Sequence, residues 1–237
     1  MKKQLKSVAI FLSVLMLVGS LFGCASNTNT AGGGKADKVT VGIIQFTAHV
    51  ALDSAREGFI AALKDNNFVE GQNLEIDFQN AQADQSNLST ISDRFVSNKV
   101  DLVLAIATPA AQAIAGKTKD IPILGTAITD YEGAKLVDSN EKPGGNVTGT
   151  SDMNPIKEQI DLLVKLVPDA KTVGVLYTSN EDNSIIQAKM AKEAIENLGL
   201  NYVEVTVTNS NDVQQAAQTI VEKCDAIYVP TDNVFAS

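Results

Sequence analysis

From position 39 onward, the apolar positions of the chain alternate between two spacings. Short runs of consecutive apolar and β-branched residues predict buried strands, whereas apolar residues three and four apart predict helices with one buried face. Strands are expected at 39–45, 74–78, 102–107, 123–126, 172–177, 202–207 and 226–229. The residues between them carry the helical pattern, so strands and helices alternate along the whole body of the chain.

The helical stretches are predicted from their apolar faces. Four such faces occur, formed by Leu52, Phe59 and Leu63, by Leu88, Ile91 and Phe95, by Ile156, Ile160, Leu163 and Val167, and by Ile186, Met190, Ile195 and Leu198. A further helix is expected at 212–222. Another helix should begin beside Thr108, with the threonine as its N-cap and Pro109 at its first position.

Alternating strands and helices indicate βαβ units and a parallel sheet. The opening pattern of strand, helix, strand, helix, strand occurs twice, so we expect an α/β protein with two Rossmann-like lobes, each with a parallel sheet. The first lobe is expected at 38–148, a hinge crossover at 149–153 and the second lobe at 154–237. Because its third strand is followed by only eight residues, we expect the second lobe to be incomplete. The fragment should then bind ligand weakly or not at all, and tend to aggregate.

The N-terminal residues have the layout of a signal peptide. Lys2, Lys3 and Lys6 precede an apolar run over 8–18, which is too short to cross a bilayer. The run leads to Cys24 through the residues LFG, and this ending resembles the lipobox of bacterial lipoproteins. We therefore expect a lipoprotein signal peptide at 1–23, a lipid on Cys24 and a flexible tether at 24–37, with an ordinary signal peptide as the alternative. The protein would then be lipid-anchored at the cell membrane on its extracytoplasmic face.

Cys224 is the second cysteine of the chain. It follows an expected helix and is predicted to be a small buried apolar residue. A disulfide with Cys24 is the alternative, which an oxidising compartment would permit.

Charge and residue usage exclude several classes of function. The formal net charge of −9 argues against nucleic acid as a partner, because phosphates are neutralised by Lys and Arg. The single histidine, His49, cannot form a metal cluster or accompany a G-x-S-x-G motif, which is absent. The glycines at 32–34 follow no predicted strand, so they form no phosphate loop. We expect no catalysis, no cofactor and no metal; His49 should border a cleft or cap the helix near Leu52.

Candidate binding residues follow from topology, because open parallel sheets bind ligands at the carboxyl ends of their strands. The candidates are Gln45, Phe46, Thr108, Pro109, Ala110, Thr126 and Asp130 in the first lobe and Tyr177, Ser179, Asn183, Ser184 and Asp232 in the second.

Each candidate has an alternative, purely structural role. Thr108 and Ser184 stand at helix starts and could hold a carboxylate, or could be plain N-caps. Asp232 could take an ammonium group or form a turn. Phe46 and Tyr177 could sandwich a flat side chain, or could belong to the cores.

Five segments together resemble a known family. They are LDSAREGF at 52–59, ATPAAQA at 107–113, NVTGTSD at 146–152, YTSNEDNS at 177–184 and YVPTDN at 228–233. In this order they are similar to the substrate-binding lipoproteins of bacterial ABC importers of the tryptophan/tyrosine type. Members often carry His-Pro where this chain has His49-Val50, so one loop at the cleft edge is expected to differ.

The resemblance implies a type I periplasmic-binding-protein fold that closes on a free, often aromatic, amino acid. It also implies ABC permease and ATPase subunits as partners. On the matching positions Thr108 would face the ligand carboxylate, Asp232 its ammonium, and Phe46 and Tyr177 its side chain. A sugar, nucleoside or peptide-like ligand on the same fold, a ligand-sensing lipoprotein and a secreted hydrolase remain the alternatives.

Overall fold

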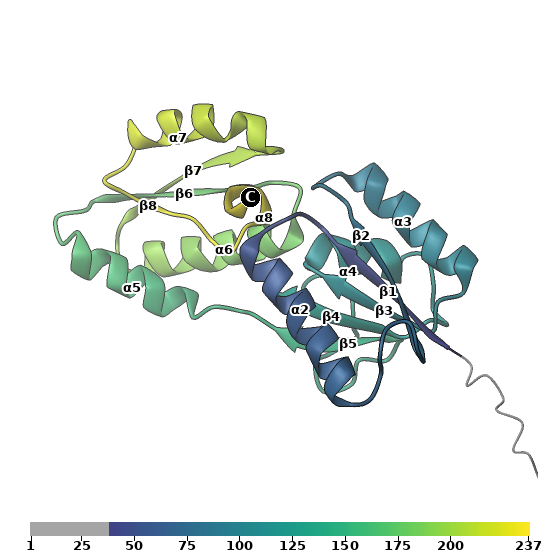
Figure 1. Cartoon of the computed structure of the whole chain (residues 1–237). Helices are drawn as coiled ribbons and strands as arrows, with labels where there is room; N and C mark the ends of the chain where they lie inside the picture. Colours follow the sequence, from purple (N-terminus) through teal and green to yellow (C-terminus); the bar gives the residue numbers. More distant parts are fainter. Residues whose placement is uncertain (1–37) are drawn as a thin grey trace, which may run out of the picture. The chain divides into compact units, whose positions relative to one another are not determined.

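The computed structural model describes residues 38–237, which form one compact unit (Figure 1). The predicted signal peptide, the lipid on Cys24, the tether and the alternative disulfide involve residues outside this range. Within it, the chain forms two parallel sheets, as the alternation of strands and helices predicts. We call residues 38–151, with the first sheet, the first lobe, and residues 156–237, with the second sheet, the second lobe.

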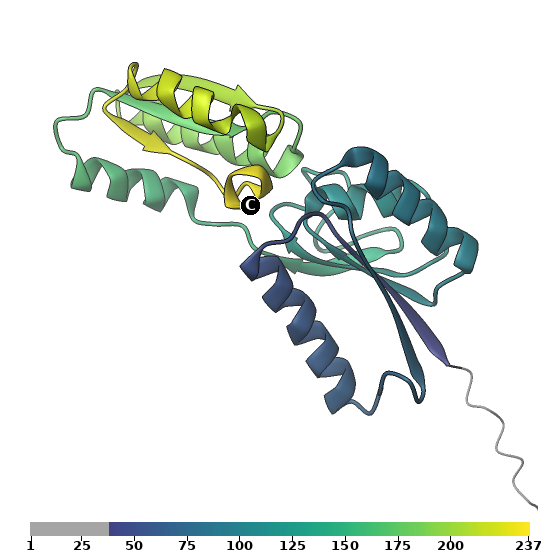
Figure 2. The ribbon, with the colours of Figure 1, turned by 45° about the horizontal axis from the view of Figure 1, so that its top comes forward.

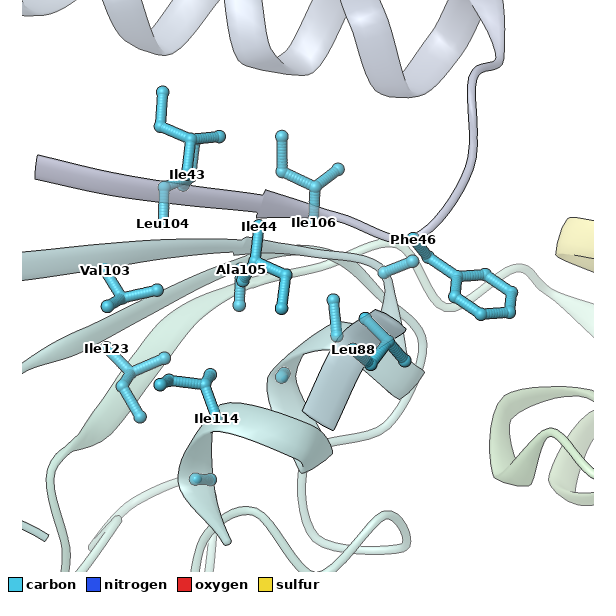
Figure 3. Packing of buried hydrophobic residues seen from close by; sticks show 14 of the residues in the cluster. Ile43, Ile44, Phe46, Leu88, Val103, Leu104, Ala105, Ile106, Ile114 and Ile123 are labelled. Atoms are coloured by element: carbon cyan, nitrogen blue, oxygen red, sulfur yellow. The ribbon is translucent and has the colours of Figure 1, made fainter. Parts of the chain in front are cut away.

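The first sheet has five parallel strands in the order β2-β1-β3-β4-β5. Its strands are β1 (Val39–Gln45), β2 (Leu74–Asn80), β3 (Leu102–Ile106), β4 (Ile123–Ile128) and β5 (Val147–Ser151), and its helices are α2 (Val50–Asp65), α3 (Gln85–Asn98) and α4 (Thr108–Ala115). Helix α2 covers one face of the sheet, and α3 and α4 cover the other (Figures 1 and 3). The four strands predicted in this lobe are confirmed within two residues at each end.

Consecutive apolar residues are needed in these strands because both faces are buried. In β1, Ile43 points toward α2, whereas Ile44 points toward the layer of α3 and α4 (Figure 3). Both side chains are fully buried. Gly42 lies under α3, where an added Cβ would come within 2.7 Å of the Phe95 ring.

The second sheet has three parallel strands in the order β7-β6-β8. Its strands are β6 (Thr172–Thr178), β7 (Asn201–Val207) and β8 (Ala226–Tyr228), and its helical segments are α5 (Ile156–Leu166), α6 (Asp182–Asn197), η1 (Ser210–Asp212), α7 (Val213–Val221) and α8 (Asn233–Ala236). Helices α5 and α6 lie on one face and α7 on the other (Figure 2). Cys224 is partly buried and packs beside α7, so its predicted burial is confirmed in part.

The expected hinge is partly occupied by a strand. Val147–Ser151 pairs with β4 as the edge strand β5, so the first lobe extends beyond the predicted boundary at 148. Residues 149–151, which had been assigned to the crossover, therefore belong to the sheet. Only 152–155 remain without regular structure before α5 begins.

The predicted apolar face of α6 is confirmed only in part. Ile195 is fully buried as expected, but Met190 and Leu198 are exposed, and the first half of the helix buries Ser184, Gln187 and Ala188. The apolar periodicity failed here because polar residues are buried at the N-terminal end of the helix, where they hydrogen-bond to one another and to neighbouring segments.

Candidate functional site

Each sheet has one point at which the strand order reverses, between β1 and β3 in the first lobe and between β6 and β8 in the second. Ligands of open α/β sheets bind beside the carboxyl ends of such strands. A pocket of about 250 Å³ lies in this region and is lined from both lobes. Its lining includes His49, Leu52, Ala127 and Asp152 from the first part of the chain and 229–233, Phe235 and Ala236 from the second.

His49 borders this pocket and also caps α2, where its Nδ1 accepts a hydrogen bond from the Ala51 backbone N–H at 3.3 Å. Both roles expected from the sequence are therefore present. Among the described residues, no group of His, Cys, Asp and Glu side chains is placed to hold a metal ion. Nor is any helix in 38–237 both long and apolar enough to cross a membrane.

Thr108 is the first residue of α4 and not its N-cap, which is Ala107. The prediction was one residue out, because Ala107 holds an uncommon backbone conformation with φ 81° and ψ 152°. Such strain in a residue other than glycine is concentrated at functional sites. The Thr108 hydroxyl is left with no hydrogen-bond partner, although the residue is only 1% exposed. Pro109 and Ala110 follow it in the buried first turn.

Gln45 lies at the carboxyl end of β1, as predicted, but its amide is engaged inside the first lobe. Its Nε2 donates to the Thr47 carbonyl at 2.7 Å and to Asp53 Oδ1 at 2.9 Å, and its Oε1 accepts from Arg56 at 2.9 Å. The hydrogen bond from Gln45 is the largest cause of a lowered pKa at Asp53, and a hydrogen bond from Arg56 to the same carboxylate adds to it. Gln45 thus fixes the loop between β1 and α2.

The predicted aromatic sandwich is absent from the structure. Phe46 is buried in the core of the first lobe, near Leu88 (Figure 3). Tyr177 packs against the separate cluster beneath α5 and α6, and its hydroxyl donates to Glu204 at 3.2 Å. Desolvation and the Glu204 carboxylate raise the pKa of Tyr177. The two rings therefore have the core positions that were the alternative reading.

Three further candidates make local contacts. Thr126 lies in β4 beside β5, where its hydroxyl accepts a 3.4 Å hydrogen bond from Thr150. The Asp130 carboxylate accepts from the backbone N–H groups of Glu132 and Gly133, so it shapes a turn. Ser179 is exposed and donates to the Val207 carbonyl at 3.3 Å.

Asp232 is the centre of a buried network in the second lobe. Its Oδ2 accepts from the Thr178 backbone N–H and the Ser184 hydroxyl, both at 2.7 Å. Its Oδ1 accepts from the Thr178 hydroxyl at 2.8 Å and from the N–H groups of Val234 and Phe235, which it caps at the start of α8. Five donors therefore fill the hydrogen-bonding capacity of the Asp232 carboxylate. Ser184 is one of these donors and is not the predicted N-cap of α6, because the N-cap is Glu181.

A second buried carboxyl group lies beside this network. Glu181 is 2% exposed, and its Oε2 accepts from Asn183 Nδ2 at 3.2 Å and from Asn233 Nδ2 at 2.5 Å. Burial, with a smaller contribution from the charge of Asp232, raises the pKa of Glu181 to about 7. Glu181 Oε1 and Asn183 Oδ1 have no hydrogen-bond partner.

Contacts between the lobes lie next to these residues. Gln112 of α4 donates to the Asp182 carboxylate of α6 at 2.7 Å. Gln187 of α6 reaches the hydroxyl of Thr129 in the first lobe at 3.5 Å, and within its own lobe it donates to the Thr231 carbonyl at 3.0 Å. The starts of α4 and α6 are thereby held near each other.

Sequence reasoning located the right segments but missed several residues within them. Glu181, Gln187 and Asn233 are buried or partly buried at the site, yet none was singled out as a binding residue. The polar run 177–184 offered a signal, because a segment that ends a buried strand and carries many polar groups must hydrogen-bond them internally. Whether Glu181 or Asp182 is the buried acid of this segment depends on the path of the loop between β6 and α6. The spacing of apolar and polar residues does not predict that path.

Two parallel α/β lobes with polar groups gathered at their strand-order reversals define a two-lobed solute-binding protein. Comparison with known proteins makes the assignment specific: residues 40–237 match the family model for ABC transporter substrate binding proteins. The chain belongs to this family, and its fold is the type I periplasmic-binding-protein fold. Proteins of this family act on the extracytoplasmic side of the membrane.

Known relatives agree with this assignment. A tyrosine-binding protein of Clostridioides difficile (strain R20291) is 43% identical over 244 residues, which cover all of this chain and 70% of the relative. The structure of an ABC domain in complex with L-Trp from Streptococcus pneumonia is 43% identical, with a TM-score of 0.80 over 84% of this chain and 67% of that one. The ligand-free, open structure of a substrate binding protein with adhesive properties from Clostridium difficile is 47% identical, with a TM-score of 0.59 over 83% and 66%.

Proposed function

We propose that this protein binds a free amino acid between its two lobes, delivers it to the permease and ATPase subunits of an ABC importer, and catalyses no reaction. The observation that carries the proposal is the buried, unpartnered hydroxyl of Thr108 at the start of α4. A hydroxyl and the free N–H groups of a helix start are suited to a carboxylate. One relative is a tyrosine-binding protein, and another was crystallised in complex with L-Trp. Both relatives support an aromatic amino acid as the ligand.

The assignment of the binding residues follows the geometry. Thr108, with the first turn of α4, contacts the ligand carboxylate. Leu52 and Phe235 contribute apolar surface to the pocket lined from both lobes, and there they contact the ligand side chain. Asp232 positions Thr178 and Ser184 and contacts no ligand, because its own lone pairs are filled within the lobe.

Calorimetric titration with the twenty amino acids tests the function. Thr108→Val keeps the shape of the side chain but removes the hydroxyl. We expect a roughly ten- to hundred-fold loss of affinity, since a hydrogen bond to a charged group contributes about 1.5–3 kcal/mol. Thr90→Val, at an exposed threonine of α3, should leave affinity unchanged. Absence of binding by all twenty amino acids would refute the function, and full affinity in Thr108→Val would refute the role of Thr108.

We also propose that the mature protein is held at the membrane by a lipid on Cys24. The support is the LFG-Cys24 ending after a short apolar run. Replacement of Cys24 by Ala should move the protein from the membrane fraction to the soluble fraction on cell fractionation. Unchanged membrane association of the variant would contradict the anchor.

A further inference from the structure

Two buried acceptor atoms at the carboxyl end of β6 lack a donor. They are Glu181 Oε1 and Asn183 Oδ1, on residues that are 2% and 4% exposed. The two side chains are adjacent, because Asn183 Nδ2 donates to the other oxygen of Glu181 at 3.2 Å. Leaving a buried polar atom unpaired costs free energy, so a pair of such atoms at a binding site indicates a missing donor.

The surroundings favour a cationic donor with several N–H groups. The neighbouring charged group is the Asp232 carboxylate, which adds negative potential at Glu181. None of the ion pairs found within 38–237 includes Glu181 or Asp232. An ammonium group has three donors and a positive charge, so it would satisfy both orphan acceptors and offset the buried charge.

Asn233 connects this pair of acceptors to the pocket. It lines the pocket that both lobes share, and its side-chain amide donates to Glu181 Oε2. Asp232, in contrast, already accepts from five donors of its own lobe. Between the two buried acids, Glu181 is therefore the one with an acceptor atom that no protein donor fills.

We propose that Glu181 and Asn183 receive the ammonium group of the ligand and that binding displaces a proton from Glu181 to solvent. This inference rests on the proposed function, because it requires an amino-acid ligand. In the exchange, the O–H bond of the Glu181 carboxyl breaks, the proton leaves to water, and the carboxylate accepts hydrogen bonds from the ammonium. No other bond changes.

The exchange makes binding depend on pH in a defined direction. In the free protein the pKa of Glu181 is about 7, so below that pH the carboxyl is protonated and the ligand must displace the proton. Affinity should therefore rise with pH between about 5.5 and 7.5 and level off above the pKa of the free protein. Asp232 is the charged group facing Glu181, and it stays hydrogen-bonded to Thr178 and Ser184 throughout.

Calorimetry at pH 6.5 in two buffers with different ionisation enthalpies measures the proton directly. The ligands are the amino acid that binds best and its analogue with hydrogen in place of the amino group. For the wild-type protein we expect proton release with the amino acid and none with the analogue. Glu181→Gln should lose roughly ten- to hundred-fold in affinity for the amino acid, release no proton, and bind the analogue within about two-fold of wild type. Glu193→Gln, at an exposed acid of α6, the helix that Glu181 precedes, is the matched control.

The calorimetry results distinguish the proposed role of Glu181 from the proposed amino-acid binding. Amino-acid binding by the wild-type protein without proton release would overturn the inference and leave the function standing, whether or not the variant folds. An equal loss of affinity for both ligands in Glu181→Gln would overturn it too, because a merely structural role affects them alike. Failure of the wild-type protein to bind any amino acid would refute the proposed function and the inference with it.

Discussion

At the scale of single residues, the position of a side chain in the sequence proved easier to predict than its partners. Asp232 and Gln45 stand at strand ends, as expected, but their polar atoms are engaged within their own lobes. Sequence order places a residue at the edge of a sheet, whereas hydrogen-bond partners come from segments tens of residues away. Thr178 and Ser184, which both bond to Asp232, precede it by 54 and 48 residues.

Asp232→Ala should therefore affect stability as well as binding. The change leaves the hydroxyls of Thr178 and Ser184 without their buried acceptor and removes the cap of α8. We expect a fall of roughly 2–4 kcal/mol in the free energy of unfolding, measured by urea denaturation followed by circular dichroism. Asp120→Ala, at an exposed acid, should change little. Unaltered stability of Asp232→Ala would contradict the central place of this carboxylate.

Glu181 should make the stability of the free protein decrease with pH. Its pKa in the folded protein, about 7, is above the ordinary glutamate value of 4.5, so the folded state binds the proton more tightly than the unfolded state. The resulting stabilisation is complete below about pH 4.5 and is lost as the pH rises to about 7, a change on the order of 3 kcal/mol. Urea denaturation at pH 5 and pH 8 should show this fall in the wild-type protein and a smaller one in Glu181→Gln. Equal pH dependence in both proteins would rule out a proton on Glu181.

At the scale of elements, the two lobes share a packing rule. The first strand of each lobe has a glycine beneath the helix that follows its second strand. Gly42 lies under Phe95 of α3, and Gly174 lies under Ile220 of α7 and the neighbouring Cys224, in both cases with room for no Cβ. The sequence similarity between the lobes is too weak to be recognised directly, but the same close approach of helix to strand recurs.

Alanine substitutions at two glycines of the first lobe should have opposite effects. Gly42→Ala places a Cβ 2.7 Å from Phe95 in a full core and should destabilise the protein by about 1–3 kcal/mol. Gly58→Ala, in the exposed middle of α2, meets no atom within 4 Å and should stabilise it by about 0.5–1 kcal/mol. Thermal unfolding of both variants measures the difference. A change of the same sign in both would argue against the close packing of α3 on β1.

The success of the element predictions depended on burial. Strands buried on both faces, such as β1 and β3, are continuous apolar runs and were found within a residue of their ends. Strand β5 was not predicted, because it is an edge strand with four exposed residues of five and shows no apolar run. The buried face of α6 was predicted only at Ile195, because polar residues are buried in the N-terminal half of this helix.

At the scale of the molecule, this structure superposes better on the L-Trp complex than on the ligand-free, open relative, with TM-scores of 0.80 and 0.59 at similar identity. Contacts between the lobes accompany this arrangement, notably the 2.7 Å hydrogen bond from Gln112 to Asp182. Such contacts help the ligand to hold the lobes together, because they exist only while the lobes are near each other.

Removal of the Gln112 side chain should consequently weaken ligand binding, although Gln112 is not among the proposed binding residues and the effect would act through closure of the lobes. We expect Gln112→Ala to lower amino-acid affinity by about two- to ten-fold, since a hydrogen bond to a charged group that forms only on closure adds to the binding free energy. Titration calorimetry measures the effect, and Gln215→Ala, at an exposed position of α7, serves as the control. Undiminished affinity in Gln112→Ala would show that the contact does not contribute to closure.

The strained backbone of Ala107 has a consequence for how this protein can change over generations. A glycine at this position would adopt φ 81° at little cost and would relieve the strain stored at the start of α4. The same freedom would loosen the orientation of the Thr108 hydroxyl, which we propose contacts the ligand carboxylate. Glycine at position 107 should therefore make the fold more stable and the binding of the ligand weaker, so stability and affinity oppose each other at this position.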